Sequence, residues 1–199
     1  LLWRFEGVDI PNPSHFSIAG STGGPLSILN NKVIGHSDFM TGAFSSEYGN
    51  ALSGVFDIRM RNGNRDKNEH TAQIGVLGLE LMSEGPINKE KGSSYIAAYR
   101  YSTFAFFEAI NFRLGTDAVP AYQDASFKLN FPTKNNGNFS VWGIGGLSDI
   151  DIIFSDDTVP TNDLYGENDR NQYFTTNMFT VGATPTAPLQ TTPPPSLSP

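Results

Sequence analysis

Acidic side chains gather in one stretch of this 199-residue sequence, between residues 149 and 169. Grouped carboxylate oxygens are what a hard cation such as Ca²⁺ binds, although the spacing here is not that of an EF-hand loop. A solvated acidic loop is the plainer interpretation. Glycosidase chemistry needs two carboxylates on facing rigid elements, which a single loop does not provide. The stretch contains Asp149, Asp151, Asp156, Asp157, Asp163, Glu167 and Asp169.

Two glycine-rich stretches resemble nucleotide-binding loops without completing them. Residues 49–54 have the glycine spacing of a P-loop, but Val55 and Phe56 stand where Lys and Ser or Thr are required. Residues 143–148 lack the last glycine of the dinucleotide fingerprint, so we interpret these glycines as steric, letting another element approach closely. The three histidines are scattered, cysteine is absent and no Gly-x-Ser-x-Gly elbow occurs. We therefore expect no catalytic residue, no metal ligand, no cofactor and no enzymatic activity.

Composition narrows the class of protein. The net charge of −7 argues against nucleic acid as a partner. Only 17% of residues are charged and there are 15 Phe and 20 Gly, which excludes coiled coils and most helical bundles. No apolar run is long enough to predict a membrane-spanning helix. The chain opens at Leu1 without Met or a signal-peptide pattern, so we expect an internal fragment.

Two textures divide the chain at a charged connector, residues 65–69, which is the best candidate for a module boundary. Before it, short apolar runs alternate with turn residues, and the Gly, Ser, Pro and Asn of residues 14–31 predict loop. Short strands are predicted over residues 1–10, 33–40 and 54–60.

After the connector, strands of about ten residues are predicted. In residues 124–131, Ala125, Phe127, Leu129 and Phe131 alternate strictly with polar residues, so that one face is apolar and the other polar. Residues 94–103 repeat this pattern. Gly75 and Gly78 predict a tight hairpin within residues 70–83. Further strands are predicted over residues 139–148 and 173–181.

The connections between these strands alternate in length. Residues 85–92 and 132–137 are short, whereas 104–121 and 149–171 are long, as in outer-membrane barrels with brief periplasmic turns and long external loops. A soluble antiparallel sandwich with uneven hairpins fits the patterning equally well, so both remain open on this evidence. The Pro- and Thr-rich residues 184–199 predict an unstructured and non-native tail that packs against nothing.

One motif makes the sequence recognisable. Residues 41–58 resemble the end of the plug domain of TonB-dependent outer-membrane receptors. In that family a glycine, a Tyr-Gly pair, a small residue and another glycine precede the last plug strand. Residues 1–10, 84–87, 94–102 and 126–131 resemble neighbouring parts of the same family, in the branch that carries a carboxypeptidase-regulatory-like domain. The plug-motif positions here are Gly42, Tyr48, Gly49, Ala51 and Gly54.

The resemblance implies an all-β fold with minor α content. Residues 1–64 would be the C-terminal part of the plug, and residues 65–183 the first antiparallel strands of a transmembrane barrel. About six strands do not close a barrel, so the resemblance implies a fragment with an unpaired edge. It also implies location in the outer membrane of a Gram-negative bacterium.

The function implied is energy-coupled uptake of a ligand, such as a siderophore, cobalamin, a glycan or a peptide, into the periplasm. The implied partners are outer-membrane lipid, the transported ligand, and TonB through a segment absent from this chain. The long connections at the external end would contact ligand. Their candidate residues are Phe104, Phe107, Phe112, Asp149, Asp151, Asp157 and Asp163. The alternative function is a secreted or surface all-β module that binds glycans or protein through aromatics such as Trp142 and Tyr165.

These alternatives differ in how the strands are oriented. A receptor predicts that Arg100, Asp124 and Lys128 face the barrel lumen, because Arg or Lys on the lipid face near the midplane costs about 2–4 kcal/mol. Tyr95, Tyr99, Phe127 and Leu129 would then face lipid. A soluble module predicts instead that Phe127, Leu129 and Phe131 are buried against a second sheet.

Overall fold

The computed structural model describes residues 1–17, 23–24, 26–75, 78–102, 120–133, 137–152 and 172–186. All regular elements in these ranges are β-strands, so the fold is all-β, and the minor helical content expected from the sequence has no counterpart there. Among the described residues, no helix has the length and apolar character needed to cross a membrane.

A four-stranded sheet is formed by β1 (Leu2–Phe5), β2 (Val8–Ile10), β5 (Ile34–Met40) and β6 (Val55–Met60), in the order β2-β1-β6-β5. The prediction of one strand over residues 1–10 was wrong, because Glu6 and Gly7 turn the chain back. Both have positive φ, 51° and 84°, as the two central residues of a type I′ hairpin turn require. β1 then pairs antiparallel with β2 and parallel with β6.

A second, very short hairpin lies in the stretch for which the sequence predicted only loop. β3 (Ser14–His15) pairs antiparallel with β4 (Leu26–Ser27). Its base is closed by a hydrogen bond from the Ile28 amide to the Pro13 carbonyl. Pro13 and Ile28 are both buried, so the hairpin is anchored at the point where it leaves the rest of the molecule.

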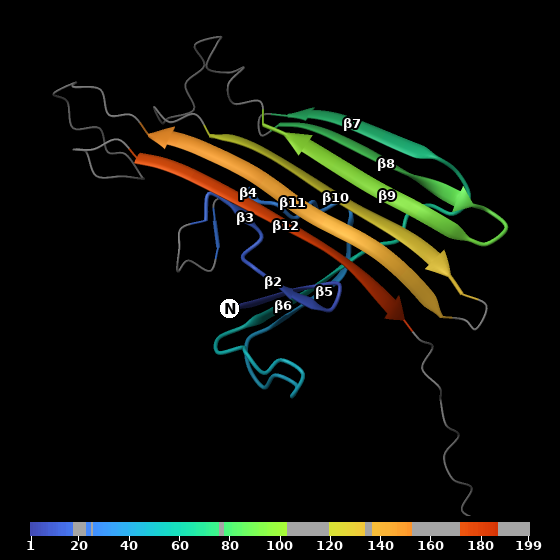
Figure 1. Ribbon diagram of the computed structural model, residues 1–199, viewed down its shortest axis with the longest axis horizontal. Coiled ribbons are helices and arrows are strands. Elements are labelled where there is room, and N and C mark those ends of the chain that lie inside the picture. The colour runs from blue at the N-terminus through green and yellow to red at the C-terminus, as the bar shows by residue number, and fades with distance from the viewer. Residues whose placement is uncertain are drawn as a thin grey trace, which may run out of the picture.

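Six longer strands form one antiparallel sheet in sequence order, β7 to β12 (Figure 1). Gly75 and Gly78 end β7 and begin β8, which confirms the predicted hairpin. The strands are β7 (Glu69–Gly75), β8 (Gly78–Asn88), β9 (Ser93–Tyr101), β10 (Ala121–Pro132), β11 (Asn138–Ile152) and β12 (Gln172–Thr186).

Two predicted boundaries are corrected. β8 continues through Gly85 and Pro86 to Asn88, and a register shift between Pro86 and Asn88 accommodates the proline. β12 continues to Thr186, so the tail predicted from Thr184 begins at least three residues later. Pairing with β11 keeps Thr184 in the sheet, because Ser140 lies opposite it. Residues 187–199 lie outside the described part of the chain.

The ends of the strands follow the predicted order. Gln123 pairs with Tyr101, Ala121 with Asp149 and Ile152 with Gln172, so the strand ends that flank the two long connections lie at one end of the sheet. We call this the long-connection end. The short connections after β8 and β10 leave from the opposite end, as predicted.

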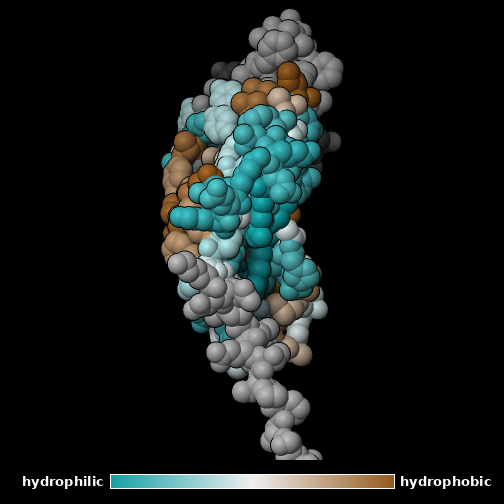
Figure 2. All heavy atoms as spheres, turned by 90° about the vertical axis from the view of Figure 1, so that its right-hand side faces the viewer, coloured by the Kyte–Doolittle hydropathy of each residue, from teal (hydrophilic) through white to brown (hydrophobic). Residues whose placement is uncertain are grey.

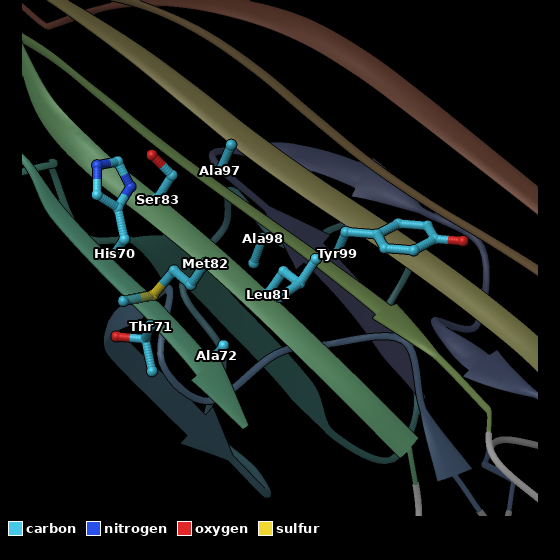
Figure 3. A pocket seen from close by; sticks show the side chains of 9 residues that line it. All are labelled: His70, Thr71, Ala72, Leu81, Met82, Ser83, Ala97, Ala98 and Tyr99. Atoms are coloured by element: carbon cyan, nitrogen blue, oxygen red, sulfur yellow. The ribbon is translucent and has the colours of Figure 1, made fainter. Parts of the chain in front are cut away.

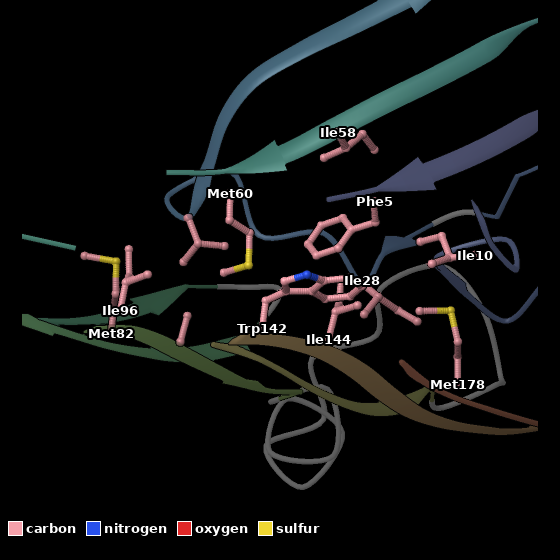
Figure 4. Packing of buried hydrophobic residues seen from close by; sticks show 12 residues of the cluster. Phe5, Ile10, Ile28, Ile58, Met60, Met82, Ile96, Trp142, Ile144 and Met178 are labelled. Carbon is pink, nitrogen blue, oxygen red and sulfur yellow. The ribbon is translucent and has the colours of Figure 1, made fainter. Parts of the chain in front are cut away.

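The hydrophobic core lies between the two larger sheets (Figure 4). Phe5, Ile58 and Met60 come from the four-stranded sheet and face Trp142 on the six-stranded sheet. Trp142 is fully buried, and its ring meets that of Phe5 edge-on at 5.3 Å between centroids. Burial of this apolar cluster holds residues 1–64 against one face of the six-stranded sheet, here called the inner face.

Candidate functional site

The inner face of the six-stranded sheet is polar, although it is the buried one. On β10, Asp124, Ser126, Lys128 and Asn130 are all buried. The apolar side chains between them, such as Phe127, point to the opposite, outer face, where they are more exposed. A water-soluble two-layer protein places its apolar face inward. The contact between residues 1–64 and this polar face is therefore the candidate functional site.

Glu6 and Lys128 form the most buried ion pair of this contact. Lys128 Nζ lies 2.8 Å from Glu6 Oε1 and donates to the Met60 carbonyl at 2.9 Å, and the Met60 amide donates to Glu6 Oε1 at 2.6 Å. Thr184 Oγ1 donates to the Glu6 carbonyl and accepts from Trp142 Nε1. We call these residues the Glu6–Lys128 cluster. Its contacts join the Glu6–Gly7 turn to β6, β10, β11 and β12.

Arg61 and Glu84 add a second link near the same end of the sheet. The two guanidinium nitrogens Nη1 and Nη2 donate to the two carboxylate oxygens at 2.6 and 2.7 Å, a bidentate geometry. The hydrogen bonds from Glu84 raise the pKa of Arg61 above its usual value, so the guanidinium stays charged. The Asn64 amide also donates to Glu84. On β8, Glu80 pairs with Lys32 at 2.8 Å, so this strand has two acidic groups met by two basic groups from residues 1–64.

A third group of contacts holds the β3–β4 hairpin nearer the long-connection end. His15 Nε2 lies 3.0 Å from Asp124 Oδ2, and both side chains are almost completely buried. The same oxygen accepts from Arg100, whose Nη2 lies 2.7 Å away and also donates to the Ser27 carbonyl. Because the carboxylate can only accept, the His15 proton lies on Nε2. We call His15, Ser27, Arg100 and Asp124 the His15–Asp124 cluster.

Gly146 on β11 makes room for this hairpin. A Cβ atom there would lie 2.9 Å from both His15 Cε1 and Ile28 Cδ1, closer than real Cβ contacts. This confirms the steric interpretation of the glycines in residues 143–148. The Phe16 amide, at 3.5 Å from Ser148 Oγ, continues the contact along β11.

The plug-motif residues lie together at one edge of the four-stranded sheet. Tyr48 is buried, and its hydroxyl donates to Asp57 Oδ2 at 3.0 Å, which ties the loop over residues 41–54 to β6. Burial and the hydrogen bond to Asp57 raise the pKa of Tyr48. Gly54 is sterically required, since a Cβ would lie 2.8 Å from Leu1 Cδ1. Gly42 and Gly49 have open space around them, and Ala51 donates its amide to the Tyr48 carbonyl.

Most predicted ligand-contact residues cannot be located. Phe104, Phe107, Phe112, Asp157 and Asp163 lie outside the described residues, as does the side chain of Asp151. Asp149 is exposed at the long-connection end and accepts from Thr175 Oγ1 at 2.8 Å. Within the ranges that the structure describes, no group of His, Asp and Glu could hold a metal ion.

A shallow groove crosses the outer face of β7, β8 and β9 (Figure 3). Small side chains, Ala72, Ser83 and Ala97, form its floor, and Leu81 and Tyr99 border it. His70 contributes its only titratable side chain. The sequence analysis did not find this groove, because it depends on which small residues become cross-strand neighbours.

The contacting residues Glu6, His15 and Thr184 were also missed. Glu6 was assigned to a strand, His15 to the surface and Thr184 to a tail, and nothing in their spacing indicates a site. The Glu-Gly pair at residues 6–7 was the one available signal, for a turn. No family model, no curated protein and no solved structure matches this chain.

Proposed function

We propose that this chain is part of a TonB-dependent outer-membrane receptor, in which residues 1–64 belong to the plug and β7 to β12 to the barrel wall. The single observation that carries the proposal is the inverted orientation of the six-stranded sheet. Its charged and polar side chains are buried against residues 1–64, and its apolar side chains point outward. A transmembrane barrel needs this arrangement, because its outer face meets lipid and its interior is polar.

Outward-facing hydrophobic side chains support a lipid-facing surface. Ile74, Phe179 and Val181 are 83%, 70% and 71% exposed. Figure 2 shows hydrophobic residues gathered along one margin of the molecule, beside a hydrophilic middle. A soluble monomer rarely leaves such a large apolar patch uncovered. The strands of 9–15 residues from β8 to β12 are also of the length that crosses a bilayer, about 9–11 residues when tilted.

Polar atoms on the outer face support the same proposal because they satisfy one another. Ser83 Oγ lies 3.1 Å from the Tyr95 hydroxyl, and the Tyr99 hydroxyl donates to Gln123 Oε1 at 2.7 Å. Lipid offers no hydrogen-bond partner, so polar groups that face it must pair within the protein. On a water-exposed sheet no such pairing is needed.

The alternative, a secreted or surface binding module, receives less support. It expects a second sheet over Phe127, Leu129 and Phe131, whereas in the described part of the chain the small sheet lies on the other face. It also expects Trp142 to contact ligand, whereas Trp142 is fully buried.

The ion pairs suggest how such a receptor would work. A wide barrel leaks unless a domain blocks its lumen, and that domain must rearrange for ligand to pass. Glu6–Lys128 and Arg61–Glu84 would hold the plug against the wall, and energy delivered through TonB would separate them. The ligand, whether siderophore, cobalamin, glycan or peptide, is not identified by these residues, and we propose no catalytic role.

Site-directed spin labelling in lipid tests the proposal. The chain contains no cysteine, so single cysteines can be placed along residues 124–131 of β10 in protein expressed from its complete coding sequence. We expect labels at 125, 127, 129 and 131 to be accessible to oxygen, which dissolves in lipid. A water-soluble nickel chelate should not reach them. If these positions collide with the nickel chelate instead, the outer face meets water and the receptor proposal fails.

A further inference from the structure

Two sets of contacts hold residues 1–64 to the six-stranded sheet, and they share no residue. The Glu6–Lys128 cluster and the Arg61–Glu84 pair hold the four-stranded sheet. The His15–Asp124 cluster holds the β3–β4 hairpin. On β10 the two sets are four residues apart, a separation of about 13 Å at the usual rise of a strand. Breaking one set therefore leaves the partners of the other in place.

The hairpin is also bounded by two buried residues. Pro13 and Ile28 are joined by a backbone hydrogen bond and pack at the edge of the core. Between them, the described residues of the hairpin reach the six-stranded sheet mainly through polar contacts, from His15, Phe16 and Ser27. Polar contacts can be exchanged for water at much lower cost than the apolar core.

Phe16 holds strain within this hairpin. Its φ is 55°, in the left-handed region that bulky residues rarely adopt. The conformation is maintained while the Phe16 amide meets Ser148 and the neighbouring His15 is paired with Asp124. Strained residues persist only where surrounding contacts hold them. Loss of the His15–Asp124 contact would let the strain relax and favour the detached state.

We propose that the β3–β4 hairpin is a separately releasable part of residues 1–64, which detaches from the six-stranded sheet while the four-stranded sheet stays bound. His15–Asp124 is the contact that controls release. The proposal rests on the described contacts alone and holds whether or not the chain belongs to a receptor. In the proposed receptor the hairpin would release near the long-connection end, where external ligand arrives.

Hydrogen exchange on the full chain, folded in detergent micelles, tests this. His15→Leu removes the hydrogen bond but leaves Asp124 paired with Arg100, so we expect exchange in residues 14–27 to rise about tenfold or more. The amides of Met60 and Arg61 should keep their wild-type rates. Lys128→Met is the matched variant on the other cluster, and we expect it to raise exchange at Met60 and Arg61 without affecting residues 14–27.

A second pair of variants isolates the strain. Phe16→Ala and Phe16→Gly both remove the ring, but only glycine relieves the positive φ. Release should be slower in Phe16→Gly, with exchange in the hairpin about fivefold lower or more than in Phe16→Ala. Equal rates in this pair would overturn the role of strain. If His15→Leu and Lys128→Met each loosen both regions, or if His15→Leu loosens neither, the hairpin is not an independent unit and the proposal is overturned.

Discussion

The two larger sheets place their polar residues on opposite sides of the same interface. The four-stranded sheet contributes mainly apolar side chains, Phe5, Ile58 and Met60, as any half-buried sheet does. The six-stranded sheet contributes Glu84, Asp124 and Lys128 to that interface and directs Phe179 and Val181 away from it.

The charges on the inner face find their partners in residues 1–64. Lys128 meets Glu6, Glu84 meets Arg61 and Asp124 meets His15. A buried charge without a partner is strongly unfavourable, so the six-stranded sheet depends on the first 64 residues for the satisfaction of its inner face. The comparison teaches that burial alone does not decide which residues face inward. What lies on the other side of the sheet decides it.

The largest effect is expected from breaking one half of the Glu6–Lys128 pair. Glu6→Gln leaves a buried ammonium facing a neutral amide and the Met60 carbonyl, so we expect a loss of about 3–5 kcal/mol in the free energy of unfolding. Denaturant unfolding in micelles measures this. The double variant Glu6→Gln, Lys128→Met removes both charges and should recover much of the loss. If the double variant is as unstable as the sum of the singles, the two side chains do not interact in the folded protein.

A charge on the outer face tests the other side of the comparison. We expect Leu129→Arg to cost about 2–4 kcal/mol when the protein is folded in a lipid bilayer. Thr175→Arg is the matched control, because Thr175 also faces outward but lies at the long-connection end beside Asp149, where the cost should fall to about 0–1 kcal/mol. Refolding into vesicles measures both. Equal costs would mean that the outer face has no membrane midplane at Leu129.

Much of the six-stranded sheet could be predicted from the sequence, because period-two alternation and glycine-marked turns act locally. The strand over residues 124–131 and the hairpin at Gly75 and Gly78 are examples. The contacts could not be predicted in the same way. Glu6 meets Lys128 across 122 positions of sequence and His15 meets Asp124 across 109, and only the packing of the sheets brings them together.

The sequence also hid the β3–β4 hairpin. Its strands are two residues long, too short for periodicity, and their composition favours loop. The glycines were better guides: Gly146 marked a close approach, although what would approach it could not be read from the sequence.

Filling the space at Gly146 should have an intermediate effect. Gly146→Ala places a methyl group against His15 and Ile28, and we expect it to cost about 1–3 kcal/mol by overpacking. Gly49→Ala is the control, because nothing lies near its Cβ position, and it should change the stability little. Thermal unfolding of both variants decides the matter. A Gly146→Ala protein as stable as the wild type would show that the hairpin does not press against β11.

The smallest effect is expected at Tyr48, on the side of the four-stranded sheet that carries Arg4 and Asp57. Tyr48→Phe removes the hydrogen bond to Asp57 and leaves a buried carboxylate less satisfied, so we expect a loss of about 1–2 kcal/mol at pH 7. The effect depends on pH. Burial and the neighbouring Asp57 raise the pKa of Tyr48, so the protonated phenol is the form that the folded protein favours.

Its stabilisation is therefore complete below the pKa of a free tyrosine, about 10, and is lost as pH rises through the higher pKa of the folded protein. The wild type should accordingly exceed Tyr48→Phe in stability at pH 7, and the difference should shrink at strongly alkaline pH. Denaturant unfolding at both pH values measures this. A difference that is the same at both would mean that the Tyr48 hydroxyl does not bind Asp57, and that the loop over residues 41–54 is held by its other contacts.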